Sequence, residues 1–146
     1  MKTILPRLKG VAACIMVVAS IQTVRAQAPQ KMSYQAVVRT SANELVTSKQ
    51  VGMRLSILQG TATGSAVYVE TQTPTTNANG LVTIAIGTGL PITGTFAGID
   101  WSEGPYFIKT ETDPTGGTNY TITATTQLMS VPYALYAKTA GSSNAW

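Results

Sequence analysis

Asp100 and Glu103 are the first residues whose types and spacing could do chemistry. Two carboxylates can act as the acid and base of a glycosidase, but only at a set separation inside a sugar-binding cleft. Carboxylate oxygens also suit calcium. The segment from Ser102 to Pro105 is typical of a turn, because glycine and proline interrupt regular structure. We therefore favour a capped turn with solvated acids and keep a weak hydrolase as an alternative.

Most other catalytic chemistry is excluded by composition. The chain has no histidine, which excludes a Ser-His-Asp triad, a histidine-ligated zinc and an imidazole acid or base. Its single cysteine, Cys14, lies near the N-terminus. The glycine-containing segment from Gly87 to Leu90 is too short for a phosphate-binding loop and has no βαβ setting. The sequence thus predicts no enzyme activity, no cofactor and no metal site.

Aromatic residues offer two binding candidates. Trp101 and Tyr106 could form a platform for sugars, because flat aromatic faces stack on such ligands. Packing in the core or at a sheet edge is the competing interpretation, and we favour it. Tyr133 and Tyr136, with Leu135 between them, have the i, i+3 spacing of one helix face. We expect the two tyrosines to dock the tail onto the sandwich or to pack against a partner copy, and all three residues are candidates for a partner or linker contact.

A central hairpin must position the aromatic and acidic candidates. Residues Tyr106 to Thr112 alternate between two faces, as expected of a strand. The run Asp113 to Gly117 is a turn, and Tyr120 to Val131 is the returning strand. Glu111 and Asp113 share a face at strand spacing beside Lys109, which predicts a solvated charge stripe. Proline at 132 ends the strand and begins a short helix.

Earlier segments predict further strands. Four runs alternate or are β-rich, with turn residues between them: Ser33–Thr40, Val51–Leu58, Ala66–Thr71 and Leu81–Ile86. In the third run we expect Val67 and Val69 to point inward. Threonine occurs 21 times after residue 26, which favours an all-β fold. We predict a Greek-key, immunoglobulin-like β-sandwich of about seven strands with a short C-terminal helical extension.

The N-terminus has the pattern of a secretory signal peptide. The formal charge is +4, but four basic residues lie in the first 26 positions, and the remaining six basic residues equal the six acidic ones. The charge therefore gives no argument for nucleic-acid binding. The apolar run Val11 to Ile21 is too short to span a bilayer, and we place cleavage after Ala26, with a cut after Ala28 as the alternative. Lipidation at Cys14 is a minor alternative. We expect no membrane span after cleavage.

Several phrases resemble one family. They are SYQAVVR at 33–39, VGMRLSIL at 51–58, TNANGLV at 76–82, IDW at 99–101 and VPYALYA at 131–137. Together they resemble the N-terminal β domain of secreted or surface proteins of Bacteroidota-type bacteria. In that family the domain often precedes collagen-like or tail-fibre-like domains. The resemblance covers about residues 32–138 and implies a domain without a catalytic motif.

The sequence therefore predicts a secreted or cell-surface, non-catalytic structural or interaction module of a Gram-negative bacterium, which presents or joins adjoining domains. We expect a signal peptide at 1–26, a linker at 27–31, the sandwich at 32–131, a helical extension at 132–138 and a flexible tail at 139–146. Partners would be other domains, copies of the chain or glycans. A carbohydrate-binding module that uses Trp101 and Tyr106 is the alternative, and strand exchange through 33–40 is a further hypothesis.

Overall fold

The computed structural model describes residues 30–129. These residues form seven strands and two short 3-10 helices. The strands are β1 Met32–Val37, β2 Gly52–Gln59, β3 Ala66–Gln72, β4 Leu81–Ile86, β5 Leu90–Thr93, β6 Tyr106–Asp113 and β7 Ile122–Gln127, and the 3-10 helices are η1 Phe96–Gly98 and η2 Trp101–Glu103. The described part of the chain contains no α-helix. The expected all-β class is therefore confirmed.

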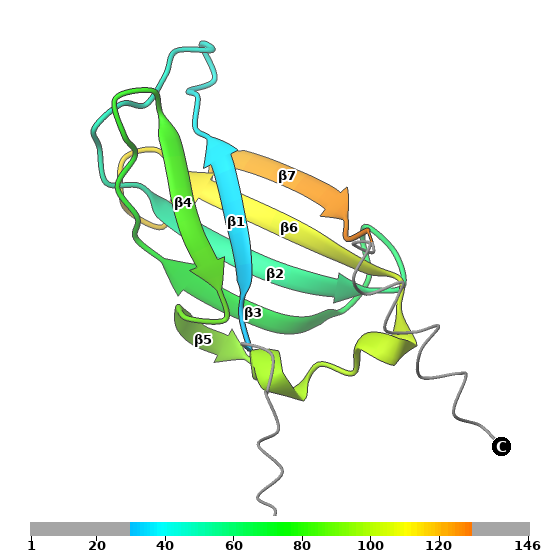
Figure 1. Cartoon of the computed structure of the whole chain (residues 1–146). Helices are drawn as coiled ribbons and strands as arrows, with labels where there is room; N and C mark the ends of the chain where they lie inside the picture. The colour runs from blue at the N-terminus through cyan, green and yellow to red at the C-terminus, as the bar shows by residue number, and fades with distance from the viewer. Residues whose placement is uncertain (1–29, 130–146) are drawn as a thin grey trace, which may run out of the picture.

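The strands make two antiparallel sheets. β1 pairs with β4, and the larger sheet has the order β5-β3-β2-β6-β7. The pair β1–β4 lies across one face of the larger sheet (Figure 1). We call the covered face of the larger sheet its inner face and the opposite one its outer face. The predicted helical extension at 132–138, with Tyr133, Leu135 and Tyr136, lies outside the described residues, as do the predicted signal peptide and the tail at 139–146.

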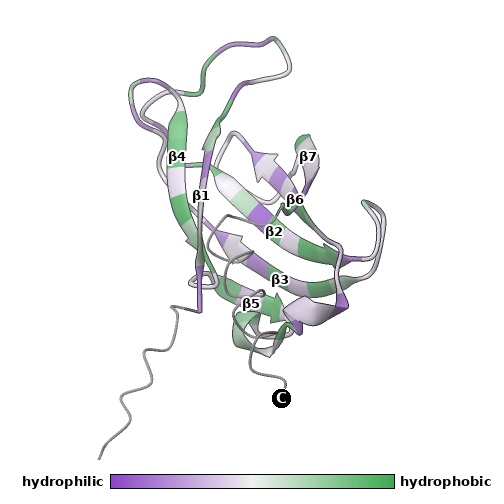
Figure 2. Ribbon diagram, turned by 45° about the vertical axis from the view of Figure 1, so that its right-hand side comes forward, coloured by the Kyte–Doolittle hydropathy of each residue, from purple (hydrophilic) through white to green (hydrophobic). Residues whose placement is uncertain are grey.

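The core lies between the two sheets. The alternation in β2 and just before it places Val51, Met53, Leu55 and Ile57 on one face, and all four are buried. Val82, Ile84 and Ile86 of β4 are buried in the same cluster, and apolar residues follow much of β4 (Figure 2). Burying such side chains contributes roughly 1.5–3 kcal/mol each. This pattern was predicted correctly, because a period of two puts alternate residues on one face.

The prediction for the third strand was wrong in part. In β3, Tyr68 and Glu70 lie opposite Ile57 and Leu55, so they face the core, and both are buried. Val69 lies opposite Ser56 and therefore faces outward. The register shifts between Ile57 and Leu58, which makes Val67 an extra residue on β3. Val67 packs against the core, as predicted. A bulge of this kind inverts the face that follows it, which alternation alone does not reveal.

Two further boundaries differ from the prediction. The returning strand of the hairpin spans Ile122–Gln127 within the longer run that was predicted. The glycine-rich stretch at 87–98, which was not among the predicted strands, contains β5 and η1. β5 pairs with the edge of β3 through a shifted register and contains Pro91. Proline is tolerated at an edge because it needs no ladder hydrogen bond on its open side.

Candidate functional site

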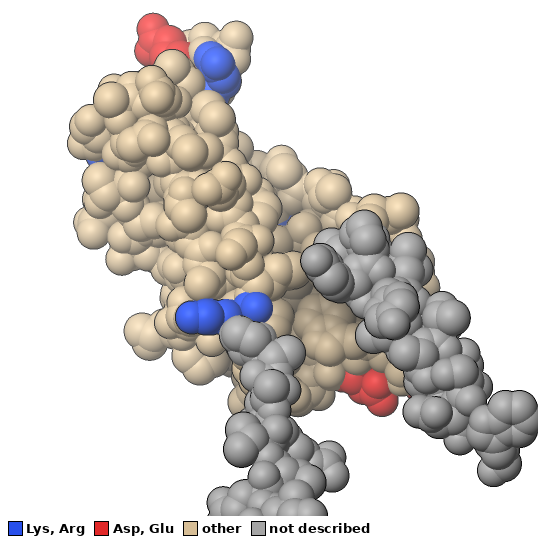
Figure 3. Space-filling view, in the orientation of Figure 1, with Lys and Arg blue, Asp and Glu red and all other residues tan. Residues whose placement is uncertain are grey.

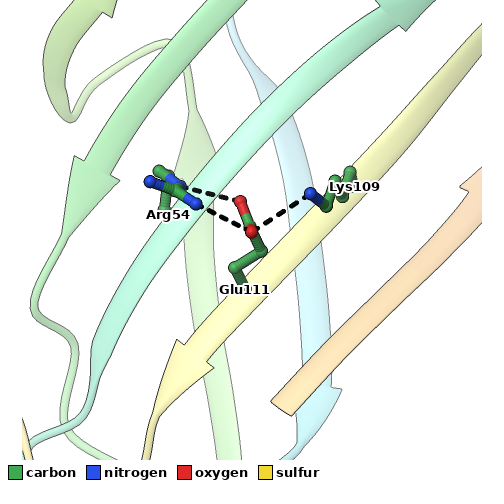
Figure 4. Close-up of polar contacts among 3 residues, drawn as sticks. All are labelled: Arg54, Lys109 and Glu111. Carbon is green, nitrogen blue, oxygen red and sulfur yellow. Dashed lines mark hydrogen bonds and ion pairs between the residues drawn. The ribbon is translucent and has the colours of Figure 1, made fainter. Parts of the chain in front are cut away.

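A charged cluster lies on the outer face of the larger sheet. Arg54 of β2 stands directly opposite Glu111 of β6, and Lys109 lies two residues earlier on β6. Residues two apart on a strand share a face, so the three side chains meet. Arg54 donates from Nε and Nη2 to the two carboxylate oxygens of Glu111, at 2.7 and 2.8 Å. Lys109 Nζ lies 3.1 Å from Glu111 Oε1 (Figure 4).

Glu111 is buried beneath its two cations. The hydrogen bond from Arg54, followed by the contact with Lys109, lowers the pKa of Glu111 although burial opposes this. The same bond to Glu111 raises the pKa of Arg54. The ring of Tyr120 lies 4.8 Å from the guanidinium carbon, a cation–π contact that covers Arg54. Two cations share one carboxylate, so the cluster keeps one positive charge in excess.

The expectation of a solvated charge stripe was wrong for both acids. Glu111 is 8% exposed and Asp113 only 2%. Asp113 Oδ1 accepts from the backbone N–H and the hydroxyl of Thr115, and Oδ2 accepts from the backbone of Asn119. The bonds from Thr115 lead the causes that lower the pKa of Asp113. The side chain of Asp113 thus stabilises the hairpin turn by hydrogen bonds to residues that follow it, a typical role of aspartate at turns.

A shallow hollow of about 290 Å³ adjoins the charged cluster. We call it the outer hollow; its walls include Arg54, Ser56, Leu58, Val69, Ile92 and Lys109. Ile92 on β5 is 62% exposed, and its neighbour Leu90 is 69% exposed. Two exposed apolar side chains of β5 therefore stand near the charged cluster. Figure 3 shows the opposite side of the molecule, with the smaller sheet in front as in Figure 1, and few charged residues lie on the described surface there.

The structure brings Trp101 and Tyr106 together. Their ring centroids lie 5.1 Å apart at an interplanar angle of 67°, and Phe96 stands 5.6 Å from Trp101. Trp101 is 45% exposed, whereas Tyr106 is buried and donates its hydroxyl hydrogen to the backbone carbonyl of Asp100. The two rings do not form one flat platform. The Tyr106 ring instead packs edge-on against Trp101, and part of the indole remains exposed to solvent.

Asp100 is the N-cap residue of η2, and Glu103 is the last residue of this short helix. Asp100 Oδ1 accepts hydrogen bonds from the backbone N–H and the hydroxyl of Ser102, which lower the pKa of Asp100. Both acids are exposed. This is the capped-turn geometry that the sequence favoured. No group of three His, Cys, Asp or Glu side chains within residues 30–129 is placed to hold a metal ion.

Sequence reasoning missed Glu70, whose side chain is fully buried. Its Oε2 accepts from the Tyr68 hydroxyl at 2.7 Å and from the backbone N–H groups of Gly87 and Gly89 at 3.1 and 2.8 Å. Its Oε1 accepts from Gln72 Nε2 at 2.7 Å. Glu70 therefore ties the turn between β4 and β5 to β3. A lone acid within an apolar strand was the only signal available in the sequence.

Comparison with known proteins places the chain in a sequence family. Residues 33–132 match a domain family described as a domain of unknown function (DUF8740). No curated protein and no solved structure matches the chain. Within the described residues, no helix has the length and apolar character needed to cross a membrane.

Proposed function

The chain belongs to the family of domains of unknown function DUF8740, and we propose that it is a non-catalytic interaction module whose partner rests in the outer hollow. The observation that carries this proposal is the exposed apolar side chain of Ile92, with exposed Leu90 on the same strand, beside a fixed excess positive charge at Arg54 and Lys109. Both features stand on strands, which hold a binding surface more rigidly than loops do.

The proposal places this module outside the cell. The signal-like N-terminus supports export, and the resemblance to surface proteins supports a role in presenting or joining adjoining domains. For topology, we propose the Greek-key, immunoglobulin-like class, supported by connections that pass from one sheet to the other after β1, β3 and β4.

A site-specific crosslinking experiment tests this function. A photoreactive residue replaces Val69 in the outer hollow, or Ser33 on the exposed side of β1 as a matched control. After irradiation of the producing cells, we expect a discrete adduct from the Val69 position that disappears when Ile92→Glu is added. An equal adduct pattern from both positions, or no adduct at Val69, would contradict the proposal.

Carbohydrate binding is a second candidate, and the exposure of Trp101 favours it. A sugar ring would stack on the exposed part of the indole, and the contact with the buried Tyr106 would hold the indole in its orientation. Trp101→Ala should then abolish glycan binding on an array, and Trp101→Phe should keep part of it. Silence of the wild-type protein across the array, or binding that survives Trp101→Ala, would remove this candidate.

A further inference from the structure

The open edge of β7 lacks the features that usually protect a strand edge. Residues Ile122–Gln127 contain no charged residue and no proline, and their pairing with β6 has no register shift. Proteins usually blunt an exposed edge with charge, proline or a bulge, because free backbone groups recruit other strands. The opposite edge of the same sheet follows that rule, since β5 has four residues, a proline and a shifted register.

β7 is also uncovered on both faces. Ile122 is partly buried, and every later residue of the strand is exposed. Ala124 and Thr126 lie on the inner face, because they pair with Thr110 and Ile108 of β6, yet the smaller sheet does not bury them. In both ribbon views β7 lies at the side of the larger sheet, away from β4 (Figures 1 and 2). Within residues 30–129, no layer of side chains lies in the way of an incoming strand there.

The register shows which backbone groups of β7 are free. Leu128 donates its N–H to the carbonyl of Tyr106, which makes this opposed pair a hydrogen-bonded one. Hydrogen-bonded and non-bonded pairs alternate along an antiparallel ladder. The even residues of β7 therefore bond to β6. Thr123, Thr125 and Gln127 direct their N–H and C=O groups to the open edge.

We propose that this edge pairs with the β7 edge of a second copy of the chain, antiparallel and about a twofold axis at Thr125. In this register Thr125 meets its own copy and Thr123 meets Gln127, which joins the two larger sheets into one continuous sheet. Three opposed pairs form about six backbone hydrogen bonds, two at each pair.

The side chains select a second copy over an unrelated peptide. A twofold axis places like residues near one another, so a charged edge would repel its copy, whereas β7 brings only Thr, Ala and Gln together. None of the β7 residues lines the outer hollow, so backbone groups rather than a side-chain pocket would recognise the incoming strand. Backbone pairing alone gives a dimer that forms and dissociates with concentration, since no buried apolar interface adds to it.

Sedimentation of the purified protein over a wide concentration range tests the proposal. Thr125→Pro removes one outward N–H, at an edge position where proline is tolerated because the missing donor faces away from β6. Thr125→Val keeps the N–H and is the matched control. We expect a monomer–dimer equilibrium for the wild type and for Thr125→Val, and a dissociation constant at least tenfold higher for Thr125→Pro.

Amide hydrogen exchange of the wild type gives a second measurement that does not depend on the folding of the proline variant. The amides of Thr123, Thr125 and Gln127 should become protected as concentration rises, while those of Ala124 and Thr126 stay protected throughout. A wild type that is monomeric at every concentration overturns the proposal, as does dimerisation of Thr125→Pro equal to that of the wild type. Protection of the outward amides at all concentrations equally would show that another part of the same chain covers the edge, and would also refute it.

Discussion

Replacing the buried Glu70 by glutamine should destabilise the protein strongly, although the two side chains have almost the same shape. The carboxylate accepts four hydrogen bonds, one each from Tyr68, Gln72, Gly87 and Gly89. A carboxylate only accepts, whereas an amide replaces one oxygen with a donor group. In Glu70→Gln, at least one of the four donors therefore faces another donor.

The neighbouring glutamine cannot repair this conflict. Gln72 Nε2 also donates to the carbonyl of Ala85 at 2.9 Å, so turning its amide would bring two oxygens together there. A hydrogen bond to a charged group contributes about 1.5–3 kcal/mol, and an unsatisfied buried donor costs about 1–3 kcal/mol. We therefore expect Glu70→Gln to lower the free energy of unfolding by about 2–4 kcal/mol, a large share of the roughly 5–15 kcal/mol typical of a domain.

Urea unfolding at neutral pH measures this change, with Glu44→Gln as the matched control. Glu44 is exposed, and its replacement should stay within about 0.5 kcal/mol of the wild type. The amides of Gly87 and Gly89 should exchange faster in Glu70→Gln, because they lose their acceptor. A cost below about 0.5 kcal/mol for Glu70→Gln, or unchanged exchange at both glycines, would refute the assigned role of the carboxylate.

Three further predictions concern the charged cluster, the hairpin turn and the N-terminus. The hydrogen bond from Arg54 lowers the pKa of Glu111 below its ordinary value of 4.5. The ionised Glu111 therefore contributes its full stabilisation above pH 4.5, and this stabilisation is lost as the pH falls through the lowered pKa. Glu111→Gln should flatten this acid limb in unfolding titrations, and an unchanged limb would contradict the prediction. Gly52→Ala should lower the free energy of unfolding in urea more than Gly60→Ala does. A Cβ at position 52 would lie 1.9 Å from the backbone oxygen of Gly117 in the hairpin turn, whereas a Cβ at position 60 would meet open space and cost only the strain of a φ of +84°. Equal costs would count against this packing. Mass spectrometry of the exported protein should find a chain that begins after Ala26, and a lipid-modified cysteine would disprove the assigned cleavage.

Local pattern determined six of the seven strands in the described residues, all except β5. Alternation over Val51 to Leu58 identified the buried face of β2 without any tertiary information, because a strand has a fixed period of two. The same argument correctly placed Lys109 and Glu111 on one face of β6. Turn residues separated the strands, and the absence of histidine restricted the chemistry before any fold was known.

Only the tertiary structure decided which of these faces meet. Arg54 and Glu111 are 57 residues apart, and they pair because β2 lies beside β6 in one particular register. A bulge between β2 and β3 turned Glu70 inward and Val69 outward, against the expectation from hydrophobicity. Alternation is a property of one strand, whereas register, bulges and sheet order depend on contacts between segments far apart in the chain, so a single sequence specifies them only through the folded whole.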